Sequence, residues 1–516
     1  MRVEQKTNVK KNVNRLFFVV IALVLQVAWI VFLVQAVNEY STIISLVTSL
    51  LAFGIALRIY VGSQGKFSDA AFKMPWIIVI LALPVLGLSL YFLLGYPGLT
   101  RKMQRRYARA HREVAEDMER EELPEGLEEL DPWLAGQAGY LYAYGRYSLY
   151  ENTDVTFYSE TTEAFETQLA ELEKAEHFIF LEYHAVEEAQ AFERLKDVLA
   201  RRAAAGVEVR LFYDDVGSIT FLWNDFEERM EALGIHCRVF NRLMPHINVF
   251  MNNRDHRKIM VIDGRVGFTG GYNLADEYFN ITHPYGYWKD TGIRLEGDAV
   301  RSMTGMFLEM WNMVERTDYN YSPYLPKYEY HAREKGYVLP YADGPLAREP
   351  IGENVYLNLI HHARHTLYIG TPYLIISDEM VRALGLAAKR GVDVRVVTPG
   401  IPDKKTVYQM TRSYYEVLIR SGVRIYEYTP GFLHEKQFYC DGETAIVGTI
   451  NLDFRSLYHH FENAVLFSSF EAVERVGDDF AQLFQVSEEV TEKYRSPRSS
   501  FMSLGYCILR LFAPLM

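Results

Sequence analysis

The chain has 516 residues, which is too long for one ordinary hydrophobic core, so two or three domains are expected. Its formal net charge of −12 argues against a general nucleic-acid binder, because phosphate backbones reward positive charge spread over broad surfaces. Redox chemistry is not indicated, because the spacings of the three cysteines fit neither a zinc cluster nor a disulfide framework: Cys237, Cys440 and Cys507.

Residues 1–112 are the most apolar part of the chain, and we predict that they anchor the protein in a membrane. Residues 16–36 form an almost unbroken apolar run, close to the roughly 20 residues that a bilayer-spanning helix needs. A cleaved signal peptide is the alternative, since basic residues precede the run, but its apolar region is longer than the roughly 7–15 residues that are usual there. A retained anchor is the preferred interpretation.

Two further apolar runs follow, at residues 42–57 and 74–94, and the second of them is interrupted by Pro84 and Gly87. Basic residues lie both before the first run and after the third, at 101–112, and three full spans cannot place both basic clusters inside. If one weak run is re-entrant or interfacial, this is a multi-pass protein of the cell membrane. Its amino terminus and its catalytic part then both lie at the cytoplasmic face.

An acidic helix and linker are predicted at residues 113–139, and the sequence pattern changes after them. From residue 140 onward, short apolar runs alternate with amphipathic stretches, which is typical of α/β architecture. Residues 177–186 and 206–216 are predicted strands and residues 191–205 a predicted helix, so together they form a βαβ unit.

The same order of elements returns later, with strands at residues 365–374 and 391–398 and a helix at 378–390. Gly206 and Gly391 hold matching positions 185 residues apart, and another matching pair of glycines is 188 residues apart: Gly234 and Gly422. This spacing indicates an internal duplication. We therefore expect two duplicated α/β/α domains that form a pseudo-twofold unit, at residues 140–325 and 326–490.

Each copy contains the pattern His-x-Lys-x-x-x-x-Asp. Residues two apart on a strand leave the same face, so the histidine and lysine of one copy can both reach one phosphate. A single such pattern would be unremarkable, but two copies at equivalent points of a duplicated fold indicate a site. The residues are His256, Lys258 and Asp263 in the first copy, and His434, Lys436 and Asp441 in the second.

Displacement at a phosphodiester needs a nucleophile, a general acid and positive groups for the nonbridging oxygens. One imidazole attacks phosphorus and forms a phosphohistidine, while the other protonates the leaving oxygen and later deprotonates the incoming hydroxyl. Lys258 and Lys436 hold the phosphate oxygens, a role that otherwise often falls to a metal ion. No carboxylate cluster demands a metal, so no metal or cofactor is expected. These residues do not decide which histidine is the nucleophile.

Four acidic residues in or near the motifs are candidates for supporting roles. A carboxylate can fix the tautomer of an imidazole, and Asp290 and Glu462 follow the motif histidines by 34 and 28 residues in matching strand-like settings. Ordinary structural pairing is the alternative for both. Asp263 and Asp441 each precede a glycine, so we expect them to stabilise a turn, although the motif includes them, and we assign them no proton transfer.

A glycine turn and an asparagine follow each motif, as FTGGYN in the first copy and IVGTIN in the second. The side-chain amides of Asn273 and Asn451 are able to bind phosphate oxygens. The glycines permit a close approach of the backbone: Gly270, Gly271 and Gly448.

At HRKIMVIDGRVGFTGGYNLADEY and HEKQFYCDGETAIVGTINLDFRSL the sequence resembles the phospholipase D superfamily, whose defining motif is this His-x-Lys-x-x-x-x-Asp pair. Within that superfamily it resembles the bacterial cardiolipin synthases, through its apolar amino-terminal runs, GGYNLADEY, and NLDFRS followed by FEN. The superfamily part covers about residues 140–490. The resemblance implies two phospholipase D-like domains.

The resemblance also implies a reaction: transfer of a phosphatidyl group from one phosphatidylglycerol to another, giving cardiolipin and glycerol, with hydrolysis as a side reaction. By the family pattern His256 is the nucleophile and His434 the acid and base. The implied partners are phosphatidylglycerol, cardiolipin and membrane lipids, with no nucleic acid, and the duplication predicts one complete site per chain. Residues 491–516 are expected to form an interfacial tail, with a buried terminal helix as the alternative for 501–516.

Three other functions compete with this one. The same chemistry with a different acceptor gives a phospholipid hydrolase or a transferase to another alcohol, or a nuclease, although the acidic charge and the anchor speak against a nuclease. A catalytically idle membrane scaffold is the alternative from another class. The two intact motifs argue against it.

Overall fold

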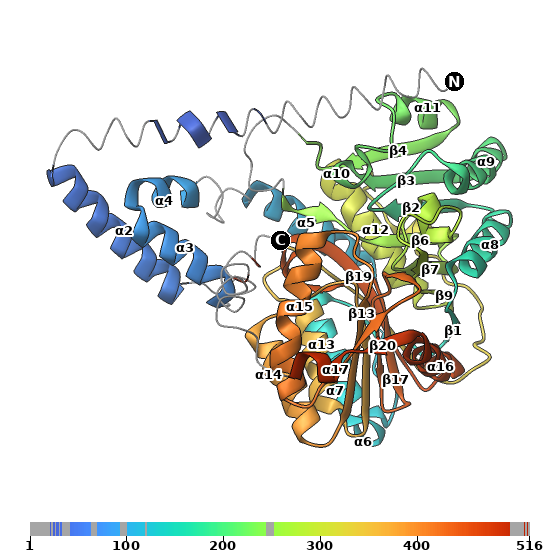
Figure 1. The fold of residues 1–516 in the computed structure, drawn as a ribbon. Helices are drawn as coiled ribbons and strands as arrows, with labels where there is room; N and C mark the ends of the chain where they lie inside the picture. Colours follow the sequence, from blue (N-terminus) through green and yellow to red (C-terminus); the bar gives the residue numbers. More distant parts are fainter. Residues whose placement is uncertain are drawn as a thin grey trace.

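A computed structural model describes residues 42–62, 70–92, 101–118, 121–243 and 252–495, together with single positions between 21 and 32 and at 510 and 513. The predicted apolar run at 16–36 and the predicted C-terminal tail therefore lie largely outside the described residues. The described chain forms a two-sheet α/β body with a group of apolar helices at one side (Figure 1).

The apolar helices are α2 (Thr42–Gly62), α3 (Ala70–Ala82) and α4 (Pro84–Leu90), and they pack on one another through a small buried cluster that includes Ala52 and Ile80. The predicted run at 74–94 is broken into two helices because Leu83, before Pro84, leaves the helical conformation (φ −135°, ψ 73°), as residues before proline tend to do. Across the residues that the structure places, every helix is either too short or too polar to cross a membrane. The expected transmembrane spans and multi-pass arrangement are therefore not supported in that part of the chain.

The basic stretch after the apolar helices is part of α5 (Arg101–Asp117), which packs against α12 (Val300–Val314) of the main body. Tyr107, Ala110 and Val114 lie on one face of α5 and are buried, as expected for an amphipathic helix on a core. His111 Nδ1 lies 2.7 Å from a carboxylate oxygen of Glu309 in α12. Two helices follow: α6 (Leu127–Leu130) and α7 (Pro132–Gly145).

The first sheet combines a parallel part with an antiparallel part. Strands β2, β3 and β4 are parallel, as the predicted βαβ unit requires, and the remaining neighbours are antiparallel. In spatial order the strands are β1 (Thr153–Tyr158), β9 (Gly292–Gly297), β7 (Val266–Gly270), β6 (Lys258–Ile262), β2 (Phe178–Tyr183), β3 (Glu208–Asp214) and β4 (Ile235–Phe240).

The second sheet repeats this order. Its parallel strands β11, β13 and β14 correspond to β2, β3 and β4, so the structure confirms the duplication of the βαβ unit. In spatial order the strands are β10 (Tyr337–Asp343), β19 (His460–Ser468), β17 (Thr444–Gly448), β16 (Gln437–Cys440), β11 (Thr366–Gly370), β13 (Asp393–Pro399), β14 (Arg424–Tyr428) and β20 (Ser487–Glu489).

The two sheets exchange short strands where they meet. Strand β5 (Arg254–Asp255), from the first half, pairs in parallel with the start of β19, and β8 (Tyr287–Lys289) pairs in parallel with β15 (Gly431–Leu433) of the second half. A third short pair joins β12 (Leu374–Ile375) to β18 (Leu452–Asp453). Because the exchanged strands adjoin both His-x-Lys motifs, they bring the two motifs to one boundary.

Helices cover the sheets, and one continuous core includes Ile259 of the first sheet together with Val447 of the second. A separate core lies under α8 and α9, on the outer face of the first sheet (Figure 1). The helices not yet named are α8 (Thr161–Leu172), α9 (Gln190–Ala204), α10 (Asp215–Ser218), α11 (Phe226–Ala232), α13 (Ile351–His362), α14 (Asp378–Lys389), α15 (Lys405–Arg420), α16 (Glu471–Val486) and α17 (Thr491–Arg495).

Candidate active site

The motif histidines and lysines lie at or just before the starts of equivalent strands, β6 and β16, and all four are buried. Lys258 Nζ donates to the carbonyl oxygen of His256 at 2.7 Å, and Lys436 Nζ donates to the carbonyl oxygen of His434. Lys436 Nζ also lies 2.9 Å from Nδ1 of His434. Each lysine therefore stays on the face of its own histidine, as the two-residue spacing predicts.

Each motif histidine pairs with a carboxylate from the other half of the chain. His256 Nδ1 lies 2.9 Å from Oε2 of Glu462, and His434 Nδ1 lies 2.7 Å from Oδ2 of Asp290. Both carboxylates were candidates from the sequence, and the structure brings both to imidazoles. A hydrogen bond from Nδ1–H to a carboxylate leaves Nε2 as the nitrogen that can attack or exchange a proton.

The exchanged strands produce this crossed pairing. The amide of His256 donates to the carbonyl of Phe461 at 2.8 Å, which places His256 beside β19, and the amide of His434 donates to the carbonyl of Lys289 at 2.7 Å. Glu462 and Asp290 are the next residues after these two acceptors. Gly271 is required here, because a Cβ at that position would lie 2.0 Å from Oδ1 of Asp290.

Thr449 and Asn463 support this arrangement, although the sequence patterns assign them no role. The hydroxyl of Thr449 donates to Oε2 of Glu462 at 2.5 Å, so this oxygen accepts from both the threonine and the imidazole. The side chain of Asn463 accepts from the amide of Lys258 at 3.3 Å and donates to the hydroxyl of Thr269 at 2.8 Å. The only sequence signal was their position, since Thr449 belongs to IVGTIN and Asn463 follows Glu462.

Burial makes positive charge costly at this site. It is the main reason why the pKa of His256 falls well below its usual value and that of His434 falls to about 4, and each neighbouring lysine lowers them further. Burial also lowers the pKa of Lys258 to about 7 and that of Lys436 to about 8. Each lysine acts on the histidine of the other half as well, so the four groups form one electrostatic unit. An anion placed among them relieves the repulsion.

Opposing effects act on the carboxylate that faces His256. Burial raises the pKa of Glu462 well above its usual range, and Lys258 is the largest influence that lowers it. The ionised carboxylate therefore depends on the nearby ammonium group and on the hydroxyl of Thr449. This dependence couples the tautomer of His256 to the charge of Lys258.

The two imidazoles have different surroundings. His434 lies among aromatic rings, with centroid distances of 5.3 Å to Tyr278 and 5.2 Å to Trp288. His256 lies beside two other histidines, with centroid distances of 5.0 Å to His184 and 5.4 Å to His460. Tyr278 ends the segment GGYNLADEY, but the sequence patterns assign none of these neighbours a role. The duplication therefore placed two imidazoles in similar geometry but in surroundings of different polarity.

The third residue of each motif lies at the far end of the motif strand. The carboxylate of Asp263 accepts from the backbone amides of residues 176, 177 and 178 at 2.8 Å each, and that of Asp441 accepts from residues 364, 365 and 366 at 2.7 Å each. Both aspartates have a positive φ, 53° and 54°. These contacts fasten the turn to the start of β2 or β11 and agree with the predicted turn-stabilising role.

The two predicted asparagines differ in their contacts. Asn273 accepts from the amide of Ala185 at 3.2 Å and donates to the hydroxyl of Tyr278 at 2.9 Å, so its side chain orients an aromatic neighbour of His434. Asn451 is buried, and its Oδ1 has no hydrogen-bond partner within the described chain. Phosphate binding by these amides stays a prediction.

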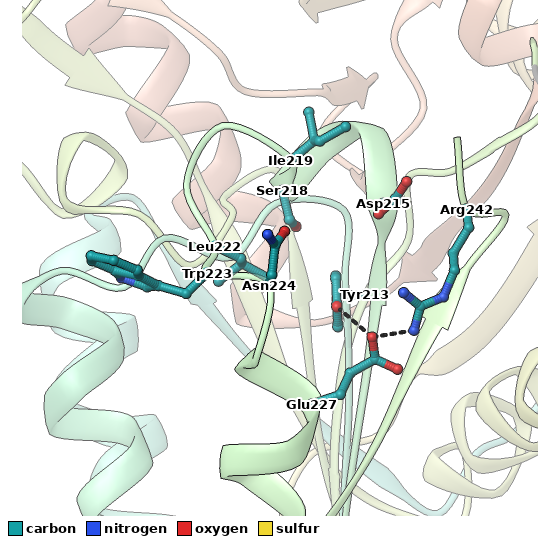
Figure 2. A pocket seen from close by; sticks show the side chains of 9 residues that line it. All are labelled: Tyr213, Asp215, Ser218, Ile219, Leu222, Trp223, Asn224, Glu227 and Arg242. Atoms are coloured by element: carbon teal, nitrogen blue, oxygen red, sulfur yellow. Dashed lines mark hydrogen bonds and ion pairs between the residues drawn. The ribbon is translucent and has the colours of Figure 1, made fainter. Parts of the chain in front are cut away.

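A small cavity of about 40 Å³ lies at the end of β3 and is lined also by residues of α10, α11 and the segment after β4 (Figure 2). It holds a few water molecules at most and no lipid headgroup, and the motif residues do not line it. Glu227 accepts there from Tyr213 at 3.3 Å and from Arg242. Its lining is Tyr213, Asp215, Ser218, Ile219, Leu222, Trp223, Asn224, Glu227 and Arg242.

Comparison with known proteins identifies the family to which a chain with this site belongs. Residues 169–311 and 356–484 match the family model described as cardiolipin synthase, PLD-like domain, and residues 49–95 match the model described as phospholipase D-nuclease N-terminal. A cardiolipin synthase of Geobacillus kaustophilus is 33% identical over 446 residues, covering 86% of this chain and 88% of its own. An uncharacterized protein of Streptococcus mutans is 40% identical over 453 residues, covering 87% and 97%.

A solved structure supports the same fold. The crystal structure of phosphatidylserine synthase from Haemophilus influenzae matches with a TM-score of 0.54 at 14% identity, and the match covers 74% of this chain and 99% of that one. The similarity to the curated relatives extends over both motif-bearing sheets. The chain thus belongs to the cardiolipin synthase family of phospholipase D-like phosphatidyltransferases.

Proposed function

We propose that this chain transfers a phosphatidyl group from one phosphatidylglycerol to the glycerol hydroxyl of a second, giving cardiolipin and free glycerol. The observation that carries the proposal is the crossed pairing of His256 with Glu462 and of His434 with Asp290. It presents two imidazoles with defined tautomers, and two lysines, to one place. In this proposal the duplicated units at 140–325 and 326–490 together form one site.

In the first step Nε2 of His256 attacks the phosphorus of the first lipid. The bond from phosphorus to the oxygen of the headgroup glycerol breaks, and His434 donates a proton to that oxygen. His434 must carry a proton for this role, although its pKa is about 4. A bound phosphate anion raises the pKa of His434 because its negative charge favours the protonated imidazole. Substrate binding itself therefore protonates the general acid.

In the second step the neutral His434 accepts the proton of the incoming hydroxyl. The hydroxyl oxygen attacks phosphorus, the bond from phosphorus to His256 breaks, and both imidazoles return to their first state. Two displacements give net retention at phosphorus. Water in place of the second lipid gives phosphatidic acid, which is the hydrolytic side reaction.

Lys258 and Lys436 stabilise the charge that builds up on the nonbridging oxygens. Their pKa values, about 7 and 8, leave them partly uncharged near neutrality, and an anionic phosphate favours the charged form. Asn273 and Asn451 lie near the glycine turns, and in this mechanism Nδ2 of Asn451 donates to a phosphate oxygen. Transfer to another alcohol is the alternative function, because the motifs do not select the acceptor.

The reaction is placed at a membrane surface, on the cytoplasmic face. Large apolar side chains of α2 are exposed, among them Leu50, Phe53 and Val61, and such a surface suits lipid rather than water. The basic helix α5 follows, and its exposed arginines suit an anionic leaflet. Flotation with vesicles tests this placement: chains that carry Leu50→Glu and Phe53→Glu are expected to bind less phosphatidylglycerol vesicle than the unmodified chain.

Lipid analysis by mass spectrometry tests the reaction. Purified enzyme in detergent is incubated with phosphatidylglycerol alone, and we expect cardiolipin and free glycerol in equal amounts. His256→Ala is expected to give neither product, whereas His236→Ala, an exposed histidine in β4, keeps full activity. Phosphatidic acid as the main product would show that the chain is a hydrolase rather than a transferase.

The same material identifies the nucleophile. A phosphorylated or phosphatidylated peptide that contains residue 256, trapped by rapid alkaline quenching, is the expected intermediate. A modified peptide that contains residue 434 instead would reverse the two roles.

A further inference from the structure

Three metal-binding side chains converge beside the first motif. His256, His460 and Glu462 each offer one donor atom, and these atoms lie within 4.8 Å of one another. All three residues are buried, and the side chain of Glu462 is fully inaccessible to solvent. His460 has no part in the proposed reaction.

The strand geometry explains the convergence. His460 and Glu462 are two residues apart on β19, so their side chains leave the same face, and β5 holds His256 against that face. Nδ1 of His256 lies 2.9 Å from Oε2 of Glu462, and Nδ1 of His460 lies 3.5 Å from Oε1. One carboxylate therefore faces two imidazoles.

Part of this cluster lacks hydrogen bonds. Within the part of the chain that the structure describes, both ring nitrogens of His460 and Oε1 of Glu462 have no hydrogen-bond partner, although His460 is only 7% exposed. Buried polar atoms nearly always have a hydrogen-bond partner. An imidazole and a carboxylate oxygen that face each other without hydrogen bonds therefore indicate a binding site for a ligand.

The duplicated half offers an internal comparison. The acceptors of the two equivalent amide bonds are Phe461 for His256 and Lys289 for His434, so Trp288 takes the position that corresponds to His460. Trp288 packs on His434 with centroids 5.2 Å apart, and its ring has no metal-binding atom. The surroundings of His256 thus contain a donor set that the equivalent surroundings of His434 lack.

We propose that His256, His460 and Glu462 bind one Zn²⁺ ion, or a similar borderline divalent cation, and that this ion inhibits the enzyme. Two imidazoles and one carboxylate are a set that zinc accepts in four-coordinate sites, with the fourth position open to water. Mg²⁺ and Ca²⁺ prefer oxygen ligands and do not suit this set. Zinc binding is inferred from the cluster alone, whereas zinc inhibition rests on the proposed function.

Inhibition follows from proton placement on the nucleophile. The ion replaces the proton between Nδ1 of His256 and Glu462, and the neutral imidazole then carries its proton on Nε2 instead. Nε2 loses the lone pair that attacks phosphorus. No redox step is involved, and removal of the ion by a chelator restores the first tautomer and the activity.

Zinc titration of the full-length protein in detergent, freed of metal with a chelator, tests the binding. Calorimetry is expected to show one Zn²⁺ per wild-type chain, and His460→Gln is expected to weaken the affinity at least about 10-fold. His460→Trp, which copies the residue that packs on His434, serves as a second variant. Melting curves of both variants with and without zinc report on their folding and on their zinc binding. His236→Gln is the matched control and should bind zinc as the wild type does.

Activity measurements test the inhibition separately. Zn²⁺ is expected to stop cardiolipin formation by the wild type at one equivalent, and His460→Gln should keep its basal activity while resisting zinc. Mg²⁺ should have no effect on either protein. Equal zinc affinity in the wild type and both His460 variants, or zinc inhibition that survives in both variants, overturns the proposal. If the wild-type chain binds zinc but makes no cardiolipin, the zinc site is supported and the proposed function is wrong.

Discussion

Glu462 and His256 are 206 positions apart and belong to different halves of the duplicated chain, yet Oε2 of one lies 2.9 Å from Nδ1 of the other. Asp290 and His434 repeat the relationship in the opposite direction at 2.7 Å. Neither half can therefore present a complete histidine and carboxylate pair by itself. The two halves form one site, with each half orienting the imidazole of the other.

The first prediction concerns these carboxylates. Glu462→Gln and Asp290→Asn are expected to lower kcat by about 10- to 100-fold with little change in KM, because an amide no longer fixes the proton on Nδ1. Steady-state rates of cardiolipin formation measure both parameters. Glu166→Gln, in an exposed pair with Arg194, is the control. Unchanged kcat in a folded Glu462→Gln chain would show that the pairing is only structural.

The second prediction separates the motif aspartates from the chemistry. Asp441→Asn is expected to cost about 1–3 kcal/mol of the free energy of unfolding, because three backbone amides lose a charged acceptor. Asparagine tolerates the positive φ of 54°, so the backbone itself is not strained. A lower denaturation midpoint with unchanged kcat is the expected result. A loss of kcat without loss of stability would contradict it.

The third prediction concerns protons that accompany anion binding. When sulfate binds, which does not titrate near neutrality, the proton uptake that Lys258 contributes is expected to be larger at pH 8 than at pH 6. The reason is that Lys258 and Lys436, with pKa values of about 7 and 8, are largely protonated at pH 6 but not at pH 8, and an anion favours their charged form.

Calorimetry in buffers of different ionisation enthalpy measures this uptake. Lys258→Arg should reduce the uptake at pH 8, because an arginine carries its proton at both pH values. Equal uptake by the two proteins would mean that Lys258 is charged in the empty site.

The fourth prediction concerns complementation between chains. A mixture of His256→Ala and His434→Ala chains is expected to restore no activity, because one chain supplies both histidines and both carboxylates. Cardiolipin formation by the mixture, measured against each variant alone, is the readout. Rescue would mean that two chains exchange their halves.

The sequence by itself determined the repeated framework. Residues 177–186 and 206–216 contain β2 and β3, and 191–205 nearly coincides with α9, because unbroken apolar runs between glycine turns specify buried parallel strands. The second copy was predicted equally well, with β11 and α14 at 365–374 and 378–390. The motif residues followed from the recurrence of one His-x-Lys spacing at equivalent points of the duplication, since a period of two places each histidine and lysine on one face.

Only the tertiary structure decided which groups meet across the two halves. The sequence named Glu462 and Asp290 but not the histidine that each serves, because that depends on the register of β5 on β19 and of β8 on β15. His460 belonged to no motif, and Thr449 lay in IVGTIN without a predicted role, so the contacts of both became visible only in the tertiary structure. The expected apolar run at 74–94 gave way to two helices at Pro84. Local patterns encode faces and turns, whereas contacts between distant strands depend on the packing of the whole chain.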